Sequence, residues 1–235
     1  MPQAVTLTFH RFDRLRDRVW AFAMMGLARP ALSRVPGIGF WKLLGSGTGE
    51  GFTPLPNTRV YAILATWPDP ETARAGIEGA AIFRRYAARA SERWTVLLTP
   101  HSVTGAWSGQ RPFTPAPAGG RDALAALTRA TLRPRALWRF WARVPGISRA
   151  IGTNRDVAFK IGVGEVPWLH QVTFSIWPDT AAMARFARQG PHAEAIARVR
   201  AEGWFREELY ARFAVHSEIG TWNGGSPLAK LDLTS

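Results

Sequence analysis

The sequence predicts an α+β fold built from two similar halves, and three observations lead to this expectation. First, the tripeptide Trp-Pro-Asp occurs at 67–69 and again at 177–179, each time at the end of an apolar run. Second, other pairs recur in the same order: Leu7-Thr8 with Leu127-Thr128, Trp20 with Trp138, Lys42 with Lys160, and Ala106-Trp107 with Thr221-Trp222. Third, strand-like and helix-like patterns alternate in one order in both halves. A period near half of the 235 residues indicates a duplicated unit rather than a solenoid.

The first half is predicted to run β-α-β-β-α-β. Alternating or continuous apolar residues predict strands at 5–9, 39–44, 59–66 and 94–98. Apolar residues at helical spacing predict helices at 15–26 and at 69–92, the second interrupted near 76–79. The glycine-rich loop at 45–51 separates the second and third strands.

The second half repeats this order. It predicts strands at 125–132, 156–163, 169–176 and 209–215, and helices at 134–147, 179–187 and 192–201. No counterpart of the glycine-rich loop is visible in this half. The loop is therefore an asymmetric insertion, a place where function is often found.

This element order is that of the ferredoxin-like split β-α-β unit. Because such a sheet carries its helices on one face, the other face must be buried. We therefore expect the halves 1–115 and 121–235, joined by a Pro- and Gly-rich linker at about 112–120, to pack sheet against sheet as a fused dimeric α+β barrel. Such a barrel commonly encloses an apolar cavity, where we expect a ligand.

Composition narrows the function. The chain has no cysteine, which excludes disulfides, thiol catalysis and Cys-rich metal sites. Its net charge of +13 favours anionic partners such as a membrane surface, but no nucleic-acid-binding motif is visible, so no nucleic-acid partner is expected. No signal-peptide pattern is present, and the longest apolar stretch, 19–28, is shorter than the roughly 18–20 residues of a bilayer span. We expect a cytoplasmic protein.

Two motifs have structural explanations. A phosphatase loop of the letters Trp-Pro-Asp requires a nucleophilic cysteine, so Asp69 and Asp179 are instead predicted to cap the helices that follow them. The glycine-rich loop lacks the Lys-Ser/Thr of a phosphate-binding loop. Its glycines are predicted to allow close approach to another backbone or to a ligand.

The five histidines form no zinc-binding motif. A single imidazole beside an apolar cavity can serve as the axial ligand of haem. His192 is the best placed, because it begins the second helical stretch after Asp179. From the residues alone, a surface or helix-start role for His192 stays open.

Four runs of sequence resemble the spheroidene monooxygenase family of carotenoid biosynthesis. They lie at 40–52 (FWKLLGSGTGEGF), 154–167 (NRDVAFKIGVGEVP), 171–179 (QVTFSIWPD) and 202–213 (EGWFREELYARF), so the resemblance spans nearly the whole chain. It implies an oxidoreductase of purple phototrophic bacteria that introduces a 2-keto group into acyclic carotenoids, as from spheroidene to spheroidenone, by successive hydroxylation. It also implies haem b iron, dioxygen, and an external electron donor such as reduced ferredoxin.

The resemblance further implies site residues and partners. His192 becomes the expected iron ligand, with His216 as the alternative, and Lys42, Ser46, Arg155 and Lys160 are polar candidates to hydrogen-bond bound oxygen. A structural, strand-end role for Lys42 and Lys160 stays open, because they also pair between the halves. A membrane-dissolved carotenoid implies peripheral contact with an anionic, photosynthetic membrane. The oligomeric state stays open.

Two alternatives remain at this point. One is a cofactor-free oxygenase on the same barrel, and the other is a non-catalytic protein that binds a hydrophobic ligand. Haem absorption in the purified protein would distinguish the haem-dependent enzyme from both alternatives.

Overall fold

The computed structural model of the chain describes residues 1–49, 53–117, 123–142, 156–188, 199, 201–229 and 231. In half one the elements are β1 (Ala4–Arg11), α1 (Leu15–Leu27), α2 (Arg29–Leu32), β2 (Trp41–Gly47), β3 (Pro56–Trp67), α3 (Pro70–Gly79), α4 (Ala81–Arg89) and β4 (Glu92–Gly105). In half two they are β5 (Leu124–Leu132), the 3-10 helix η1 (Pro134–Ala136), β6 (Phe159–Gly164), β7 (His170–Trp177), α6 (Thr180–Arg188) and β8 (Phe205–Gly220). Residues 137–142 are also helical.

The eight strands form one closed antiparallel barrel in the order β1-β3-β2-β6-β7-β5-β8-β4. Each half contributes a continuous arc of four strands, β4-β1-β3-β2 in half one and β8-β5-β7-β6 in half two. The arcs join where β2 pairs with β6 and where β4 pairs with β8. This confirms the fold class predicted from the duplication, including the strand-helix order of half one.

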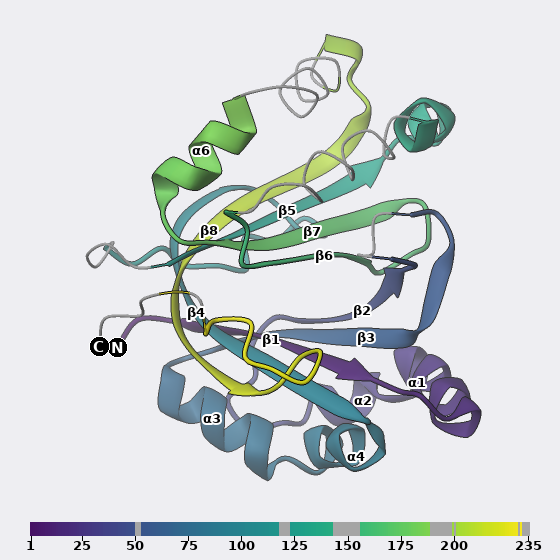
Figure 1. Cartoon of the computed structure of the whole chain (residues 1–235), viewed down its shortest axis with the longest axis vertical. Helices are drawn as coiled ribbons and strands as arrows, with labels where there is room; N and C mark the ends of the chain where they lie inside the picture. Colours follow the sequence, from purple (N-terminus) through teal and green to yellow (C-terminus); the bar gives the residue numbers. More distant parts are fainter. Residues whose placement is uncertain are drawn as a thin grey trace.

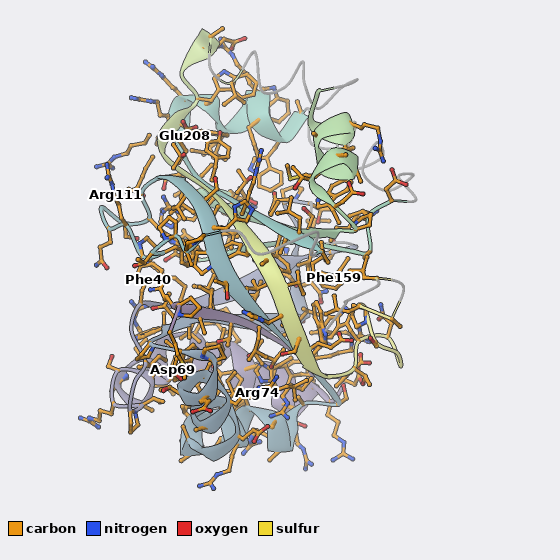
Figure 2. The ribbon with its side chains drawn as sticks, turned by 90° about the vertical axis from the view of Figure 1, so that its left-hand side faces the viewer. Phe40, Asp69, Arg74, Arg111, Phe159 and Glu208 are labelled. Atoms are coloured by element: carbon orange, nitrogen blue, oxygen red, sulfur yellow. The ribbon has the colours of Figure 1, made fainter. Side chains whose placement is uncertain are left out.

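Helices cover the outside of the barrel (Figure 1). Helices α1 to α4 lie against the arc of half one, and α6 lies on the far side, against the arc of half two. Viewed from the side, the long strands β4 and β8 cross the front of the molecule and tie the halves together (Figure 2). None of the described helices combines the length and the apolar character that a bilayer span requires.

The repeated Trp-Pro-Asp performs the same structural task in both halves. Asp69 accepts a hydrogen bond from the Thr72 backbone N–H at 2.8 Å, and Asp179 accepts one from the Ala182 N–H at 2.7 Å. Each carboxylate thus caps the helix that follows its strand, as predicted. Both tryptophan side chains are buried.

Several strands are longer than the sequence predicted, most of all β4 and β8. Their apolar signal covers only 94–98 and 209–215, but their mutual pairing extends the ladder from Trp94 to Gly105 and from Leu209 to Gly220. Register shifts near Pro100 accommodate the proline, which donates no backbone hydrogen bond. The partner strand, more than local propensity, sets the length of these two strands.

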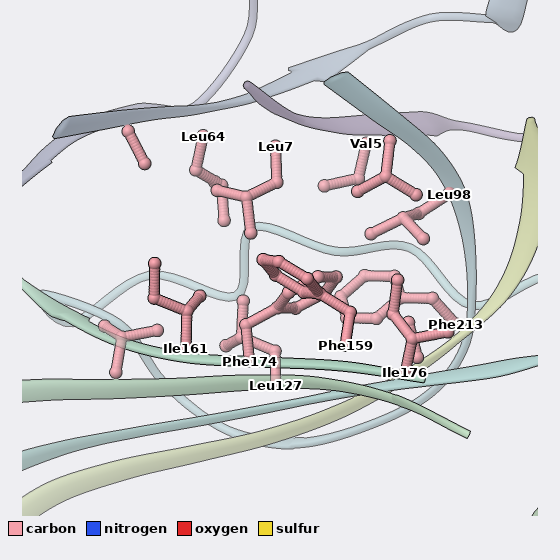
Figure 3. Packing of buried hydrophobic residues seen from close by; sticks show 14 of the residues in the cluster. Val5, Leu7, Leu64, Leu98, Leu127, Phe159, Ile161, Phe174, Ile176 and Phe213 are labelled. Atoms are coloured by element: carbon pink, nitrogen blue, oxygen red, sulfur yellow. The ribbon is translucent and has the colours of Figure 1, made fainter. Parts of the chain in front are cut away.

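The interior of the barrel is a packed apolar core (Figure 3). Side chains from the two arcs point toward one another, with Leu7 and Leu64 facing Phe159 and Phe174. The Phe9 ring lies 5.5 Å from the Trp94 ring and 5.4 Å from the Phe159 ring, measured between centroids. The described side chains in the interior pack against one another, and the expected ligand cavity inside the barrel stays a prediction.

The first part of the predicted linker is also part of this core. Phe113 is buried and lies edge-on to Phe213, with ring centroids 5.2 Å apart. The side chain of Gln3 donates to the Pro112 carbonyl at 3.1 Å and accepts from the Thr114 N–H at 2.8 Å. Residues 112–114 thus pack against the barrel and do not form an exposed linker between the halves.

Candidate active site

Five polar side chains lie together at one end of the barrel, where they point toward its interior. Alternate residues of a strand face opposite sides of a sheet, and Leu44, Leu127 and Leu209 belong to the interior core. Lys42, Arg129 and Glu207 share the inward parity of these leucines on β2, β5 and β8. With Glu165 and His170, which continue the inward parity of β6 and begin β7, they form what we call the inner polar cluster: Lys42, Arg129, Glu165, His170 and Glu207.

Arg129 is the centre of the inner polar cluster. It is 1% exposed, and its guanidinium forms an ion pair with Glu207 and approaches Glu165 at 3.7 Å. A buried charge is costly unless it is paired, so the two carboxylates are what keep this arginine inside the barrel. Its guanidinium carbon also lies 5.8 Å from the centre of the Trp107 ring.

Glu165 links the other members. It accepts a hydrogen bond from the Trp107 indole N–H at 2.7 Å and forms an ion pair with the Lys42 ammonium, also at 2.7 Å. The His170 Nδ1 atom lies 3.7 Å from the same carboxylate. Burial lowers the pKa of His170 below its ordinary value, and the attraction of Glu165 only partly opposes this. His170 is therefore neutral at physiological pH.

A tight turn at residues 107–110, the Trp107 turn, covers the inner polar cluster. The backbone N–H groups of Ser108 and Gly109 donate to Glu207 at 2.9 and 2.7 Å. Burial by itself raises the pKa of Glu207, but these two N–H groups and Arg129 outweigh it and hold the pKa below the ordinary value. Gly109 has φ of 73°, a conformation that favours glycine.

The outer face of half two differs sharply from that of half one. The aligned registers Leu7↔Leu64 and Leu127↔Phe174 show which positions correspond. On this basis Trp41, Leu43, Tyr61 and Ile63 of half one correspond to Lys160, Gly162, Gln171 and Thr173 of half two. Bulky side chains that pack under α1 to α4 are thus replaced by small or polar ones. We call this surface the half-two outer face; it comprises Thr128, Ala130, Lys160, Gly162, Gln171, Thr173 and Ser175.

The neighbouring strand β8 adds a charged group to this face. Arg212 lies opposite Ala126 of β5, at the position that Leu97 occupies in half one. The Tyr210 hydroxyl donates to Glu208 at 3.0 Å on the same side of the strand. The half-two outer face therefore combines small residues with cationic and hydrogen-bonding groups.

The predicted site residues are divided between these surfaces. Lys42 belongs to the inner polar cluster and also donates to the Ser108 hydroxyl at 2.9 Å. Ser46 is buried, and its hydroxyl donates to the Val60 carbonyl at 3.0 Å. Lys160 lies on the half-two outer face, and His216 is exposed at a register shift between β8 and β4, on the side of half one. Arg155 and His192 lie outside the described residues.

The sequence pairing of Lys42 with Lys160 is wrong. Lys42 lies opposite Leu64, and the counterpart of Leu64 is Phe174, which lies opposite Ile161. Lys42 therefore corresponds to Ile161 and points inward, whereas Lys160 points outward. A slip of one residue reverses the face on which a side chain lies.

Sequence reasoning missed Arg129, Glu165, Glu207 and Arg212. One signal was present for Arg129, because it continues the inward series Ala125 and Leu127 with a charged residue. The partners of Arg129 come from β8 and from the turn after β6, and no local pattern connects them.

Comparison with known proteins identifies the family. The chain is 52% identical over 231 residues to a spheroidene monooxygenase of Cereibacter sphaeroides, covering 97% of this chain and 71% of that protein. It is 46% identical over 233 residues to a spheroidene monooxygenase of Rhodobacter capsulatus, covering 97% and 96% of the two chains. The chain belongs to the spheroidene monooxygenase family. It is therefore an oxidoreductase of the monooxygenase class, as the resemblance of its sequence runs implied.

A third member of the spheroidene monooxygenase family, from Rubrivivax gelatinosus, is 35% identical over 208 residues, covering 88% and 80% of the two chains. No protein-family model matches the chain. Among solved structures, two of aldoxime dehydratase superpose with TM-scores of 0.65 and 0.66 at 13% and 12% identity, covering 96% of this chain and 87% and 85% of theirs. One of them is a complex with butyraldoxime. At this identity the likeness shows a shared fold.

Proposed function

We propose that this spheroidene monooxygenase family member is a haem-dependent enzyme that introduces a 2-keto group into acyclic carotenoids of the spheroidene type. The family supports the reaction class and the substrate. The observation that carries the cofactor site is the half-two outer face, where Gly162 and Thr173 replace the buried Leu43 and Ile63 of half one. A flat macrocycle requires space against a sheet, and these substitutions provide it on one half only.

The residues of this face fit the chemistry of haem b. Haem carries an apolar macrocycle and two carboxylates, and the exposed Arg212 is a cation on this face that can pair with a carboxylate. His192 belongs by sequence to the connection between α6 and β8, the strand that bears Arg212. We assign His192 as the iron ligand and retain His216 as the alternative. His216 is less suited, because it is exposed on the side of half one.

The reaction balances as two hydroxylations at one carbon. Bound haem would supply the activation of dioxygen. Each turnover inserts one oxygen atom into a C-2–H bond, releases the other as water, and consumes two electrons and two protons from a donor such as reduced ferredoxin. The resulting gem-diol loses water to give the ketone.

The chain's own groups have positioning roles in this proposal. Lys160 and Arg155 are the polar candidates to hydrogen-bond oxygen at the cofactor face. Lys42 and Ser46 are instead assigned to the barrel interior, where Glu165 and the Val60 carbonyl engage them. Three members of the inner polar cluster, Arg129, His170 and Glu207, lie on strands of half two, and Glu165 follows β6, so the cluster helps to hold these strands in register behind the site.

Haem reconstitution tests the proposal. Wild type is expected to develop a Soret band, His192→Ala to lose it, and His216→Ala to keep it. Adding imidazole to His192→Gly is expected to restore the band, because free imidazole can replace a missing axial ligand. Turnover of spheroidene under ¹⁸O₂ with reduced ferredoxin should place the label in the keto oxygen.

Other outcomes identify the alternatives. A colourless protein that still oxidises spheroidene is a cofactor-free oxygenase, and carotenoid binding without turnover under any donor indicates a carrier. An unchanged spectrum in His192→Ala together with loss in His216→Ala transfers the ligand assignment to His216. Contact with an anionic membrane, also part of the proposed function, depends on a different surface.

A further inference from the structure

Helix α1 is apolar on both sides. Ala21 and Met24 face the barrel and are buried in the core beneath the helices. On the opposite side Val19, Phe22 and Leu27 are exposed to 61%, 70% and 72%. With Leu15 these residues follow one another at intervals of four, three and five, so they form a stripe along the helix. A helix that faces water on one side normally carries polar residues there.

Three further segments near α1 carry exposed apolar residues: the turn between β2 and β3, the turn between β6 and β7, and the helical residues 137–142. The Arg18 guanidinium donates to the Thr58 hydroxyl, which ties α1 to the start of β3 beside the exposed Leu55. The indole N–H of the exposed Trp168 donates to the Pro54 carbonyl at 2.8 Å, and that of Trp141 donates to the Trp168 carbonyl at 3.3 Å.

We call this surface the apolar rim; its exposed members are Leu15, Val19, Phe22, Leu27, Leu55, Trp138, Val166 and Trp168. Together with Met1 at the chain start, these are the large apolar residues that the structure exposes in the described part of the chain. The helix α1 and the turns between β2 and β3 and between β6 and β7 lie at the same edge of the molecule (Figure 1). The rim thus gathers exposed apolar side chains from several elements at one edge of the molecule.

Positive charge flanks the apolar stripe. Residues 14–34 contain five arginines and one aspartate, a net charge of +4. The aspartate, Asp17, is buried and paired with Arg89 at 3.1 Å, whereas Arg14, Arg16, Arg29 and Arg34 are exposed. Apolar side chains bordered by exposed cations are the features of a helix that lies in the interface of an anionic bilayer.

We propose that the apolar rim docks the protein on the surface of an anionic phospholipid bilayer, with α1 lying in the headgroup region. Aliphatic and aromatic side chains would enter the acyl boundary, and the arginines would contact lipid phosphates. A lipid surface fits better than a folded partner because the exposed side chains project separately from α1, from the helical residues 137–142 and from two turns, and lipids adapt to such a surface. The purpose of docking, access to a membrane-dissolved carotenoid, rests on the proposed function; the binding itself does not.

Vesicle flotation of the full chain tests the proposal without haem or substrate. The probes are vesicles of phosphatidylcholine alone and with 30% phosphatidylglycerol. Wild type is expected to float with the anionic vesicles. Val19→Ser/Phe22→Ser is expected to lower the partition coefficient by about tenfold or more, since each side chain loses apolar burial. Arg14→Gln/Arg34→Gln is expected to lower it by about 25-fold at low salt, because one arginine contributes about fivefold.

A matched pair of substitutions controls for net charge. Arg74 and Arg111 are exposed arginines away from the rim: both are labelled in Figure 2, where the left-hand side of Figure 1 faces the viewer, whereas the rim lies at the right-hand edge of Figure 1. Arg74→Gln/Arg111→Gln removes the same charge and is expected to change binding less than threefold. Thermal unfolding should show that all variants fold, since the substituted side chains are exposed.

Three outcomes would overturn the proposal. The first is wild type that stays in solution with both vesicle types, and the second is equal loss of binding from the rim and the control arginine pairs. The third is rim variants that leave flotation unchanged but abolish self-association or binding of an acidic ferredoxin, which would assign the rim to a protein partner. A haem spectrum that survives in rim variants separates this result from failure of the proposed function.

Discussion

At corresponding positions of the two halves, an aromatic ring and a guanidinium occupy the barrel interior. Phe9 of half one lies 5.5 Å from Trp94 and 5.8 Å from Trp222, between ring centroids. Arg129 of half two, at the same register position, pairs with Glu207 and lies 5.8 Å from Trp107. The duplicated backbone thus holds an apolar centre at one place and an ionic centre at the other.

The turns that close the two places are nevertheless alike. Beside the apolar centre around Phe9, the Gly224 backbone N–H donates to the Glu92 carboxylate at 2.8 Å. Beside Arg129, the Gly109 N–H donates to the Glu207 carboxylate in the same way, at 2.7 Å. Arg11 lies 4.5 Å from the Trp222 ring and pairs with Glu92 at 3.2 Å, but it lies at the barrel edge. The two halves thus share their turns and helix caps, whereas the residue at a single inward position decides which half carries a polar site.

The outer faces extend the comparison. Half one fills its face with bulky side chains beneath four helices, whereas half two carries Gly162 and Thr173 at the places of Leu43 and Ile63. The first face stabilises the fold, and the second is the proposed cofactor face. Three predictions test these differences between the two halves, in order of the size of the expected effect.

The largest effect is expected from giving half two the residues of half one. Gly162→Leu/Thr173→Ile places on the half-two outer face the side chains found at Leu43 and Ile63. The added bulk is expected to eliminate haem binding, measured as loss of the Soret band in a haem titration. The reciprocal control is Ile63→Thr, which should destabilise by about 2–4 kcal/mol and leave the spectrum unchanged. Normal haem binding by the filled variant would place the cofactor elsewhere.

The second prediction concerns the ionic centre. Arg129→Met leaves Glu207 and Glu165 without their buried cation and is expected to destabilise the protein by about 3–5 kcal/mol, measured by urea unfolding. Arg11→Met removes the corresponding ion pair at the other turn, where the arginine side chain is 28% exposed. It is expected to cost about 0–1 kcal/mol. Equal losses from the two substitutions would remove the distinction between the two centres.

The third prediction concerns His10, whose counterpart in half two is Ala130. Burial, and secondarily the charge of Arg93, lowers the pKa of His10 from 6.5 to about 3. Below pH 6.5 the unfolded chain therefore binds a proton that the folded protein does not, so stability falls as the pH falls toward 3. The slope from this group is at most about 1.4 kcal/mol per pH unit.

His10→Phe should remove this part of the acid sensitivity. The phenyl ring suits the site, since the Tyr86 and Phe12 rings lie 5.1 and 6.2 Å from the imidazole. Unfolding free energies of the two proteins should agree most closely at pH 8 and diverge as the pH falls from 6.5 to 4. Parallel curves over this range would show that the folded protein binds this proton as readily as the unfolded chain, which would contradict the lowered pKa of His10.

Local signals predicted much of the fold. The repeated Trp-Pro-Asp marked strand ends and helix caps, because a proline that ends a ladder and an aspartate that accepts N–H groups act within a few residues. The alignment of the two halves by sequence was wrong at Lys42, which it paired with Lys160 instead of Ile161. This error of one residue places the side chain on the opposite face of the sheet. Sequence spacing cannot detect such a slip, since both residues lie on strands and only pairing with β3 or β7 fixes their direction.

The sequence by itself determined the duplication, the element order, the capping residues and the family. These depend on short-range patterns and on long runs of matching residues. Only the tertiary structure decided that apolar side chains of the two arcs pack together inside the barrel, that Arg129 pairs with Glu207 and lies near Glu165, and that the half-two outer face carries small and polar residues. Each of these follows from strand register and closure of the barrel, which bring together residues from β2, β5, β7 and β8 that no local pattern connects.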